Sequence, residues 1–330
     1  MPSDSKGRLR NLGNTAAEIY TTYGMFIILI LILIVCSVMS DVFLNGTNIS
    51  NVLRNMSTVA LVAFGMTFLL ILGMIDLSAG SVMAFAGCVC CIIIRETESV
   101  PLGMIIGIII GGLFGLVNGG VVAYFRIPAF IMTLGSQSIA RGAALLITGG
   151  NPVSNIGDGF KQFGQGYMDT WKIIPIPIVT MLIFLGITWV LLNRTKFGRH
   201  VVAMGGNENA ARASGVGPKS TVIKAFLLEG LLVGLAGVML MSRLNSGQPN
   251  GATGYEFDAI TAAVVGGTSL MGGIGNIQGA FVGCLIIGVL NNIMNLYGVS
   301  SFWQMVVKGV IIALAVIIDY KTKDILQRKG

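Results

Sequence analysis

Few residues of this chain are of a type that could do chemistry inside its long apolar stretches. Four ionisable residues interrupt these stretches: Asp76, Arg141, Glu229 and Lys308. A charge in lipid is costly unless it is paired or hydrated, so such residues are the first candidates for a functional pathway. An ion-coupled carrier would place more carboxylates or histidines at mid-membrane. The scarcity of such groups indicates that any energy source lies outside the chain.

A structural role is the alternative for three of these charges. Arg141 and Lys308 have long side chains that can reach an interface or a neighbouring backbone carbonyl. Glu229 follows Lys224 by about one helical turn, so a contact between these two side chains is expected.

The sequence predicts no catalytic residue, no cofactor and no metal site. Cys88, Cys90 and Cys91 are three nearby thiols, but zinc requires a fourth ligand and an outer shell, so we expect them to pack in a core. His200 has no partner at ligand spacing and is expected in a solvated loop. The phosphate-binding pattern G-x-x-x-x-G-K-[ST] does not occur, so the chain is not expected to hydrolyse ATP itself.

The composition indicates a membrane protein. Of the 330 residues, 54% are apolar, 11% are charged and 46 are glycine. A typical soluble domain has about a quarter charged residues and about 7% glycine. The formal net charge of +7 could suggest nucleic acid, but the basic residues lie between apolar runs rather than among aromatics on one polar element. They fit orientation in a lipid bilayer, and no nucleic acid is expected as a partner.

The apolar runs predict an all-α, polytopic membrane fold of about ten transmembrane helices, in one domain over residues 1–330. A helix that spans a bilayer needs about 20 mostly apolar residues. Nine runs fit: 23–39, 57–75, 77–94, 102–124, 129–147, 173–192, 222–241, 277–290 and 302–318. The run 258–271 would cover only about 21 Å as a helix, so a short or broken tenth element is expected. The first run has no cleavage site after it and is expected to be a retained span.

The basic residues predict the orientation of these spans. If all ten elements cross and the amino terminus is inside, fourteen of the 21 Lys and Arg residues are cytoplasmic, including Lys6, Arg8 and Arg10. Five are outside and two lie within spans. The positive-inside rule therefore predicts cytoplasmic amino and carboxyl termini. Both termini lie inside only if the short element 258–271 crosses.

Glycine recurs at every fourth position from Gly103 to Gly119 within one predicted span. This spacing puts a groove along one helix face and allows a neighbouring backbone to approach closely. The pattern therefore predicts tight helix packing in a compact bundle.

Two polar interruptions divide apolar stretches with hardly any loop between the parts. Residues 73–80 contain Asp76 and Ser78, and residues 266–273 contain Thr268 and Ser269. Non-helical backbone at membrane depth is tolerated where protein or a water-filled cavity satisfies its polar groups. Each interruption is therefore either a turn that lines or gates a pathway, or a buried connector.

The polar stretch 193–221 is expected to be a cytoplasmic loop within the same domain. It contains GGNENAARASG (205–215), in which Asn207 can cap a short alanine-rich helix and Gly215 can end it. A helix this small buries little surface of its own and suits docking into the groove of another protein. A protein partner is therefore predicted.

Five segments carry a family resemblance: GMIDLSAGSV (73–82), IPAFIMTLG with the following ARG (127–142), TKFGRHVVAMGGNENAARASGV (195–216), SGQPNGATGYEFDAITAAVVGGTSLMGGIGN (246–276) and GVLNNIMNLYGVSSFWQMVVKGVIIALAV (288–316). From about residue 43 to 320, the chain resembles the membrane subunits of bacterial ATP-binding-cassette (ABC) importers for monosaccharides. It is most similar to those that carry ribose.

The resemblance implies a homodimeric permease in the bacterial inner membrane. An extracytoplasmic sugar-binding protein would deliver the substrate, and a separate ABC ATPase subunit would bind the cytoplasmic face. Carried over by position, the residues that couple to the ATPase would be Gly206, Asn207, Glu208, Ala210, Ala211 and Gly215. Candidates for the translocation pathway or its gate are Asp76, Ser78, Arg141, Thr268, Ser269, Asn291 and Asn292.

The expected function is therefore ATP-driven sugar import by alternating access. Ribose is the first expectation; allose, xylose, galactose and other cyclic polyols stay open, because the binding protein would set specificity. The alternative is a self-sufficient secondary sugar transporter or facilitator, with the two broken turns forming a central site. That carrier would take up sugar without any other protein, whereas the importer would need its ATPase. A membrane enzyme is a third class, but the sequence shows no nucleophile or metal cluster for it.

Overall fold

The computed structural model describes residues 24–168 and 174–327, and every regular element in these residues beyond two isolated β-bridges is a helix. Within these residues, seven helices are long and apolar enough to cross a membrane. They are α2 (Gly46–Ile71), α3 (Ala79–Thr97), α4 (Val100–Phe125), α5 (Ala129–Thr148), α7 (Ile176–Arg194), α10 (Pro218–Leu244) and α12 (Ile277–Leu296). Shorter apolar helices occupy Gly24–Met39 and Ser301–Leu314, the latter within α13 (Ser301–Gln327).

Each of the nine predicted spans therefore falls on a helix, but α2 begins well before the predicted start at residue 57. The side chain of Asn45 caps it by accepting a hydrogen bond from the backbone of Thr47. Asn48 lies in its first turns and pairs with Asn292 on α12, so protein rather than lipid satisfies this polar residue. The predicted cytoplasmic charges Lys6, Arg8, Arg10, Arg328 and Lys329 and the predicted outer charge Lys172 lie outside the described residues.

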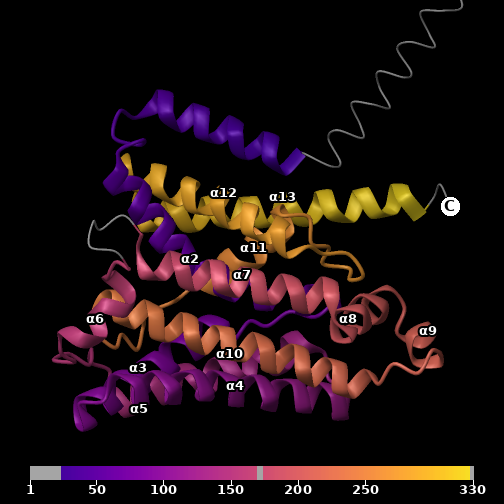
Figure 1. The fold of residues 1–330 in the computed structure, drawn as a ribbon. Helices are drawn as coiled ribbons and strands as arrows, with labels where there is room; N and C mark the ends of the chain where they lie inside the picture. The colour runs from indigo at the N-terminus through magenta and orange to yellow at the C-terminus, as the bar shows by residue number, and fades with distance from the viewer. Residues whose placement is uncertain (1–23, 169–173, 328–330) are drawn as a thin grey trace, which may run out of the picture.

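Helices α2 and α10 form the centre of the bundle, and most of their residues are buried. α10 packs against α4, α2 and α3, whereas α2 also contacts α12, α7 and the short helix α11 (Tyr255–Val265). Figure 1 shows α3, α4, α5 and α10 along one side of the molecule, and α11, α12 and α13 along the other. A helix that is apolar on all faces is buried in this way when neighbours surround it.

The glycine stripe on α4 packs directly against α10, which confirms the predicted close approach. A Cβ atom added to Gly111 would lie 2.6 Å from the Cα of Gly234 and closer still to the carbonyl oxygen of Gly230. A Cβ at Gly115 would clash with the carbonyl of Phe226. The two backbones therefore touch along a seam that has no room for side chains on either helix.

The predicted short tenth element is a half-helix followed by irregular chain. α11 ends at Val265, and its 11 residues rise about 16 Å, roughly half of a bilayer core. The chain from 266 to 276 continues without helix to the start of α12. Gly273 in this irregular part donates a 2.8 Å hydrogen bond to the carbonyl of Ile71 at the end of α2. The element therefore starts near one end of the bundle and finishes at the other.

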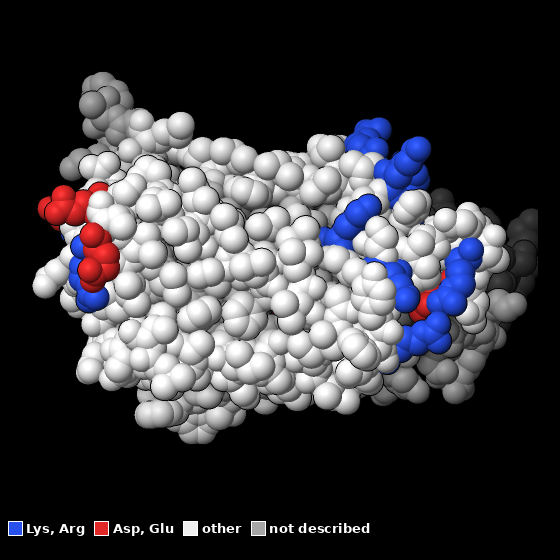
Figure 2. Space-filling model, turned by 90° about the horizontal axis from the view of Figure 1, so that it is seen from below, with Lys and Arg blue, Asp and Glu red and all other residues white. Residues whose placement is uncertain are grey.

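The face of the molecule drawn in Figure 2 has a broad uncharged band between two charged ends. Figure 2 shows Lys and Arg gathered at one end, while Asp and Glu dominate the other and the middle is almost free of charge. The basic end is the one that holds α8 (Lys196–Gly206) and α9 (Glu208–Ala213) in Figure 1. Exposed apolar side chains on α4 and α5 include Ile105, Ile109, Leu113, Phe130, Ile131 and Leu134. Such a band is expected where lipid surrounds a protein.

Candidate functional site

The segment α8–α9 lies at the basic end, and most residues of α9 are exposed. The hydroxyl of Thr195 accepts a hydrogen bond from the N–H of Gly198 and caps α8. Asn207 ends α8 and caps α9, because its side chain accepts a 3.0 Å hydrogen bond from the N–H of Ala210. After α9, Gly215 has φ +85°, a conformation that glycine adopts at little cost. The predicted capped helix is therefore confirmed, and its helical part is six residues long.

The predicted coupling residues do not all face outward. Gly206, Asn207, Glu208, Ala210 and Gly215 are exposed and open to a partner. Ala211 is buried, and its carbonyl accepts a 3.1 Å hydrogen bond from the N–H of Val216. A contact with another protein is therefore open to five of the six residues, whereas Ala211 holds α9 against its own chain.

An ion pair stiffens the exposed face of α9. Glu208 and Arg212 are four residues apart, and a carboxylate oxygen of Glu208 lies 2.8 Å from a guanidinium nitrogen of Arg212. Both side chains are about half exposed, so solvent screens the pair and its contribution is about 0.3–0.5 kcal/mol. The pair fixes the direction of both side chains more than it stabilises the fold.

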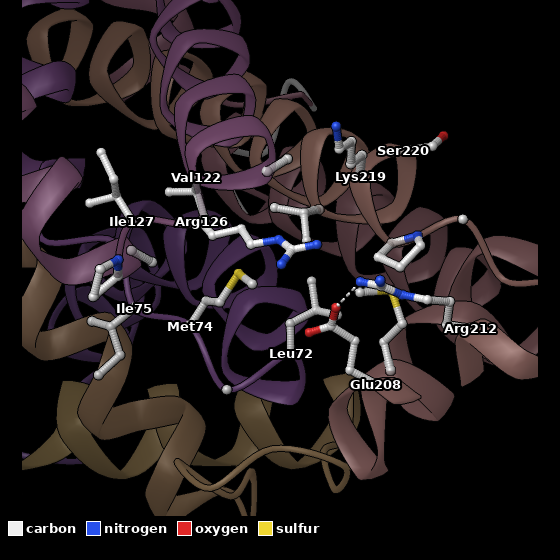
Figure 3. Close-up of a pocket in the computed structure, with 18 of the residues that line it drawn as sticks. Leu72, Met74, Ile75, Val122, Arg126, Ile127, Glu208, Arg212, Lys219 and Ser220 are labelled. Carbon is white, nitrogen blue, oxygen red and sulfur yellow. Dashed lines mark hydrogen bonds and ion pairs between the residues drawn. The ribbon is translucent and has the colours of Figure 1, made fainter. Parts of the chain in front are cut away.

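A large cavity separates α9 from the ends of the membrane helices. It has a volume of about 870 Å³, and Figure 3 shows Arg126 reaching into it towards the pair of Glu208 and Arg212. Lys219 lies at its edge, with the ammonium 4.3 Å from the centre of the Tyr124 ring. Apolar residues line the rest, including Met74, Ile75, Val122, Ala123, Ile127 and Phe130. The cavity is thus an apolar recess with basic side chains around it.

The end of α8 lies close to the two predicted interruptions of the membrane bundle. A Cβ atom added to Gly205 would lie 2.7 Å from the backbone nitrogen of Gly273 and closer to the carbonyl oxygen of Ile71. Ile71 is the last residue of α2 and lies two residues before the interruption at 73–80, and Gly273 belongs to the interruption at 266–273. The end of α8 therefore contacts the second interruption and the end of the helix that leads into the first, in both cases at backbone atoms.

The first interruption is held by a buried hydrogen-bond network. A carboxylate oxygen of Asp76 accepts 2.6 Å hydrogen bonds from both the N–H and the hydroxyl of Ser78. Asn118 on α4 donates to the Ser78 hydroxyl and accepts a hydrogen bond from Ser136 on α5. Buried polar groups are stable when paired in this way. Asn118 and Ser136 are not among the site residues predicted from the sequence, although an amide inside the apolar run 102–124 is a visible signal.

Glu229 lies beside this network rather than contacting Lys224. Lys224 is exposed, and the ion pairs among the described residues do not include it. Glu229 is turned into the bundle, where it faces Asp76 and shares a small cavity with Asn118. The expected contact with Lys224 is therefore wrong, because the face of α10 that carries Glu229 packs on Gly65 of α2.

Arg141 and Lys308 each interact with polar groups inside the protein. Arg141 donates from one guanidinium nitrogen to the carbonyls of Pro249 and Gly251, which confirms the expected backbone contact. Lys308 forms a 2.8 Å ion pair with Asp258 rather than the expected contact with an interface or a backbone carbonyl. Both charges therefore tie helices to the segment around α11.

The remaining pathway candidates lie in two separate places. Thr268 and Ser269 are buried in the second interruption, where the N–H of Ser269 donates a 3.0 Å hydrogen bond to the carbonyl of Ile274. Asn291 and Asn292 lie near the opposite end of the bundle, on the last turns of α12. The structure therefore does not gather the seven candidates into one site within a single copy of the chain.

The cysteines pack in the core, as expected. Cys88, Cys90 and Cys91 are free and fully buried on α3. Cys90 lies close to Gly103 and Gly107 on α4, where a thiol fills space between the helices.

Comparisons with known proteins give a consistent picture. The family described as branched-chain amino acid transport system / permease component matches residues 48–316. The chain is 44% identical to the ribose import permease protein RbsC of Bacillus subtilis, over 90% of this chain and 92% of that protein. It is 41% identical to RbsC of Escherichia coli K12 over 93% and 96%, and 42% identical to the L-arabinose transport system permease protein AraH of the same strain over 93% of each. No solved structure matches the chain significantly.

Proposed function

We propose that this chain, which belongs to the family of branched-chain amino acid transport system permease components, is the membrane subunit of an ATP-driven ABC importer for a monosaccharide. Relatives named for ribose and arabinose import are 41 to 44% identical to it over nearly its whole length. Ribose is the first substrate to test and L-arabinose the second. The multi-pass helical fold places the protein in the bacterial inner membrane.

The proposed topology has ten crossing elements and cytoplasmic termini. The nine apolar helices provide nine crossings, and α11 with the irregular chain 266–276 provides the tenth. The contact of Gly273 with Ile71 at the basic end supports a full crossing by this element. Basic residues at the α8–α9 end support a cytoplasmic position for that end.

In the proposed mechanism, the ATPase acts on the permease through a contact at α9. A chain without a phosphate-binding loop needs a mechanical contact with an ATPase, and α9 offers an exposed, capped helix for that contact. The observation that carries the proposal is that Gly205, in the last turn of α8, is seated against Ile71 and Gly273. A push on α9 would therefore reach both interruptions of the bundle. Closure of two ATPase subunits would rock two copies of the permease between outward and inward states.

Three partners follow from this proposal: an ABC ATPase subunit at α9, an extracytoplasmic sugar-binding protein at the opposite end, and a second copy of the chain. The binding protein would hold the sugar tightly, whereas the permease would hold it weakly, because a site with high affinity in both states would trap the sugar.

Reconstitution tests the proposal against a self-sufficient carrier. The permease is placed in liposomes with its ATPase and binding protein, and uptake of radiolabelled D-ribose and L-arabinose is measured. We expect uptake to require ATP and all three components. Accumulation of sugar by the permease alone, driven by a proton or sodium gradient, would overturn the proposal in favour of the carrier.

A further inference from the structure

A polar cavity lies at the end of the bundle opposite α9, between α2, α11, α12 and α13. Its volume is about 210 Å³. Its polar lining consists of five amides, one ion pair and one phenol: Asn55, Asn291, Asn292, Asn295, Gln304, Asp258, Lys308 and Tyr255. Apolar side chains such as Val59 and Ile287 complete the wall. This density of amides is unusual for a site between transmembrane helices, where polar side chains are costly unless they have a purpose.

Hydrogen bonds between the helices fix most of this wall in place. Asn292 and Asn48 donate to each other reciprocally, at 2.8 and 3.0 Å. Gln304 on α13 donates a 2.8 Å hydrogen bond to Asn295 on α12. These pairs join α2, α12 and α13 around the cavity, so its shape is set before any ligand arrives.

Two groups in the wall keep hydrogen-bonding capacity for a ligand. Asn291 lines the cavity, and its side chain makes no hydrogen bond with any residue in the described part of the chain. Its amide offers two donors and an acceptor. Lys308 uses one of its three protons to bond Asp258. The cavity therefore offers donors and an acceptor at the same place.

The charge of the cavity favours a neutral ligand. Lys308 and Asp258 are 2.8 Å apart and neutralise each other. Lys308 would attract an anion, but Asp258 would repel it. Asp258 would attract a cation, but Lys308 would repel it. A polyol has hydroxyl groups that both donate and accept hydrogen bonds, so it can use the ion pair and the amides together.

We infer that this cavity is a binding site for one monosaccharide on the permease itself, an inference that rests on the proposed function in sugar import. The cavity is smaller than the roughly 300–1,000 Å³ of sites for drug-sized ligands, and it would hold about seven waters at about 30 Å³ each. That size suits one sugar ring. Tyr255 and Ile287 offer apolar surface to the C–H face of the ring, and Asn291 and Lys308 bind its hydroxyls. The site lies at the end where a binding protein would release its cargo.

Enantiomers provide a sharp test. The purified permease in lipid nanodiscs is heated in increasing concentrations of D-ribose, L-ribose, D-arabinose or L-arabinose, and its unfolding temperature is recorded. A ligand that binds the folded state raises this temperature in a saturable way. Sugars also stabilise proteins non-specifically, but the two enantiomers do so equally, so a difference within a pair requires a chiral site. We expect one enantiomer of at least one pair to give additional, saturable stabilisation.

The variant Asn291→Leu assigns this effect to the cavity. We expect it to weaken binding of the preferred enantiomer about tenfold, because one amide pairing is lost. The matched control is Gln278→Leu, the same kind of change on an exposed residue at the other end of α12, which should leave binding unchanged. Equal shifts by both enantiomers of each pair overturn the inference, and this comparison needs only the unaltered chain. Full chiral stabilisation in a folded Asn291→Leu protein also overturns it.

The reconstitution assay separates this inference from the proposed function. If ATP drives import by the full complex while no enantiomer difference appears in the permease alone, the site is wrong and the function stands. If the chiral, Asn291-dependent binding appears but ATP drives no import, the site stands as a sugar site and the importer assignment fails.

Discussion

The N–H of Gly273 donates a 2.8 Å hydrogen bond to the carbonyl of Ile71, which joins the irregular chain after α11 to the last residue of α2. The end of α8 is seated on this joint at Gly205. Gly272 and Gly273 have φ of +82° and +80°, where any residue with a Cβ atom is strained. The contact between Ile71, Gly273 and the end of α8 therefore requires glycine at 272 and 273 in the irregular chain and at 205 in α8.

Gly205→Ala tests the seating of α8. The added Cβ atom has no room beside Ile71 and Gly273, so we expect a loss of about 1–3 kcal/mol in the free energy of unfolding. The adjacent Gly206→Ala is the matched control, because a Cβ atom there meets nothing within 4 Å. Thermal unfolding of both variants in detergent measures the difference. Equal stability of the two would show that α8 is not seated as described.

Glu208→Lys tests whether α9 binds the ATPase. The change breaks a screened surface pair, so folding and membrane insertion should lose less than about 1 kcal/mol. Loss of ATPase co-purification and of sugar-dependent ATP turnover is the expected result. The double change Glu208→Arg with Arg212→Glu restores the ion pair on α9 but reverses the charges offered to a partner. Recovery of ATPase binding by this double variant would mean that the pair acts only by stiffening the helix.

Gly111→Leu tests the seam between α4 and α10. A side chain at this position would have to enter the backbone of Gly230 and Gly234, so we expect the permease to unfold at a clearly lower temperature or fail to accumulate. Gly120→Leu on the same helix is the control, since a Cβ atom there meets nothing within 4 Å. Membrane abundance and thermal unfolding are the measurements, and similar behaviour of the two variants would contradict the seam.

Arg141→Gln tests the hydrogen bonds that connect α5 to the loop before α11. The change removes hydrogen bonds from a charged donor to the carbonyls of Pro249 and Gly251, at a cost of about 1.5–3 kcal/mol each. Hydrogen exchange of residues 246–254 should therefore become faster. Arg95→Gln is the control, because Arg95 is exposed and pairs only with its neighbour Glu96 among the described residues. Unchanged exchange in the loop of the Arg141 variant would show that the contact does not hold it.

Contacts between buried polar residues on different helices could not be predicted from the sequence. The expectation that Glu229 contacts Lys224 considered spacing on one helix, but the rotation of α10 against α2 turned Glu229 towards Asp76. Asn48 and Asn292 are separated by 244 residues, and nothing in either local pattern indicates that they pair. Such contacts depend on which helix faces pack together, and that is a property of the whole bundle.

The sequence alone determined the membrane class, the approximate positions of the nine apolar helices and the capped helix at α9. These follow from local properties: apolar length, cap residues and glycine spacing act over a few turns of one segment. Only the tertiary structure decided that α8 rests on Ile71 and Gly273, that Ala211 faces inward, and that Asn291 opens into a polar cavity. Those relationships arise because distant segments share one packed interior, where each helix can turn only one face to each neighbour.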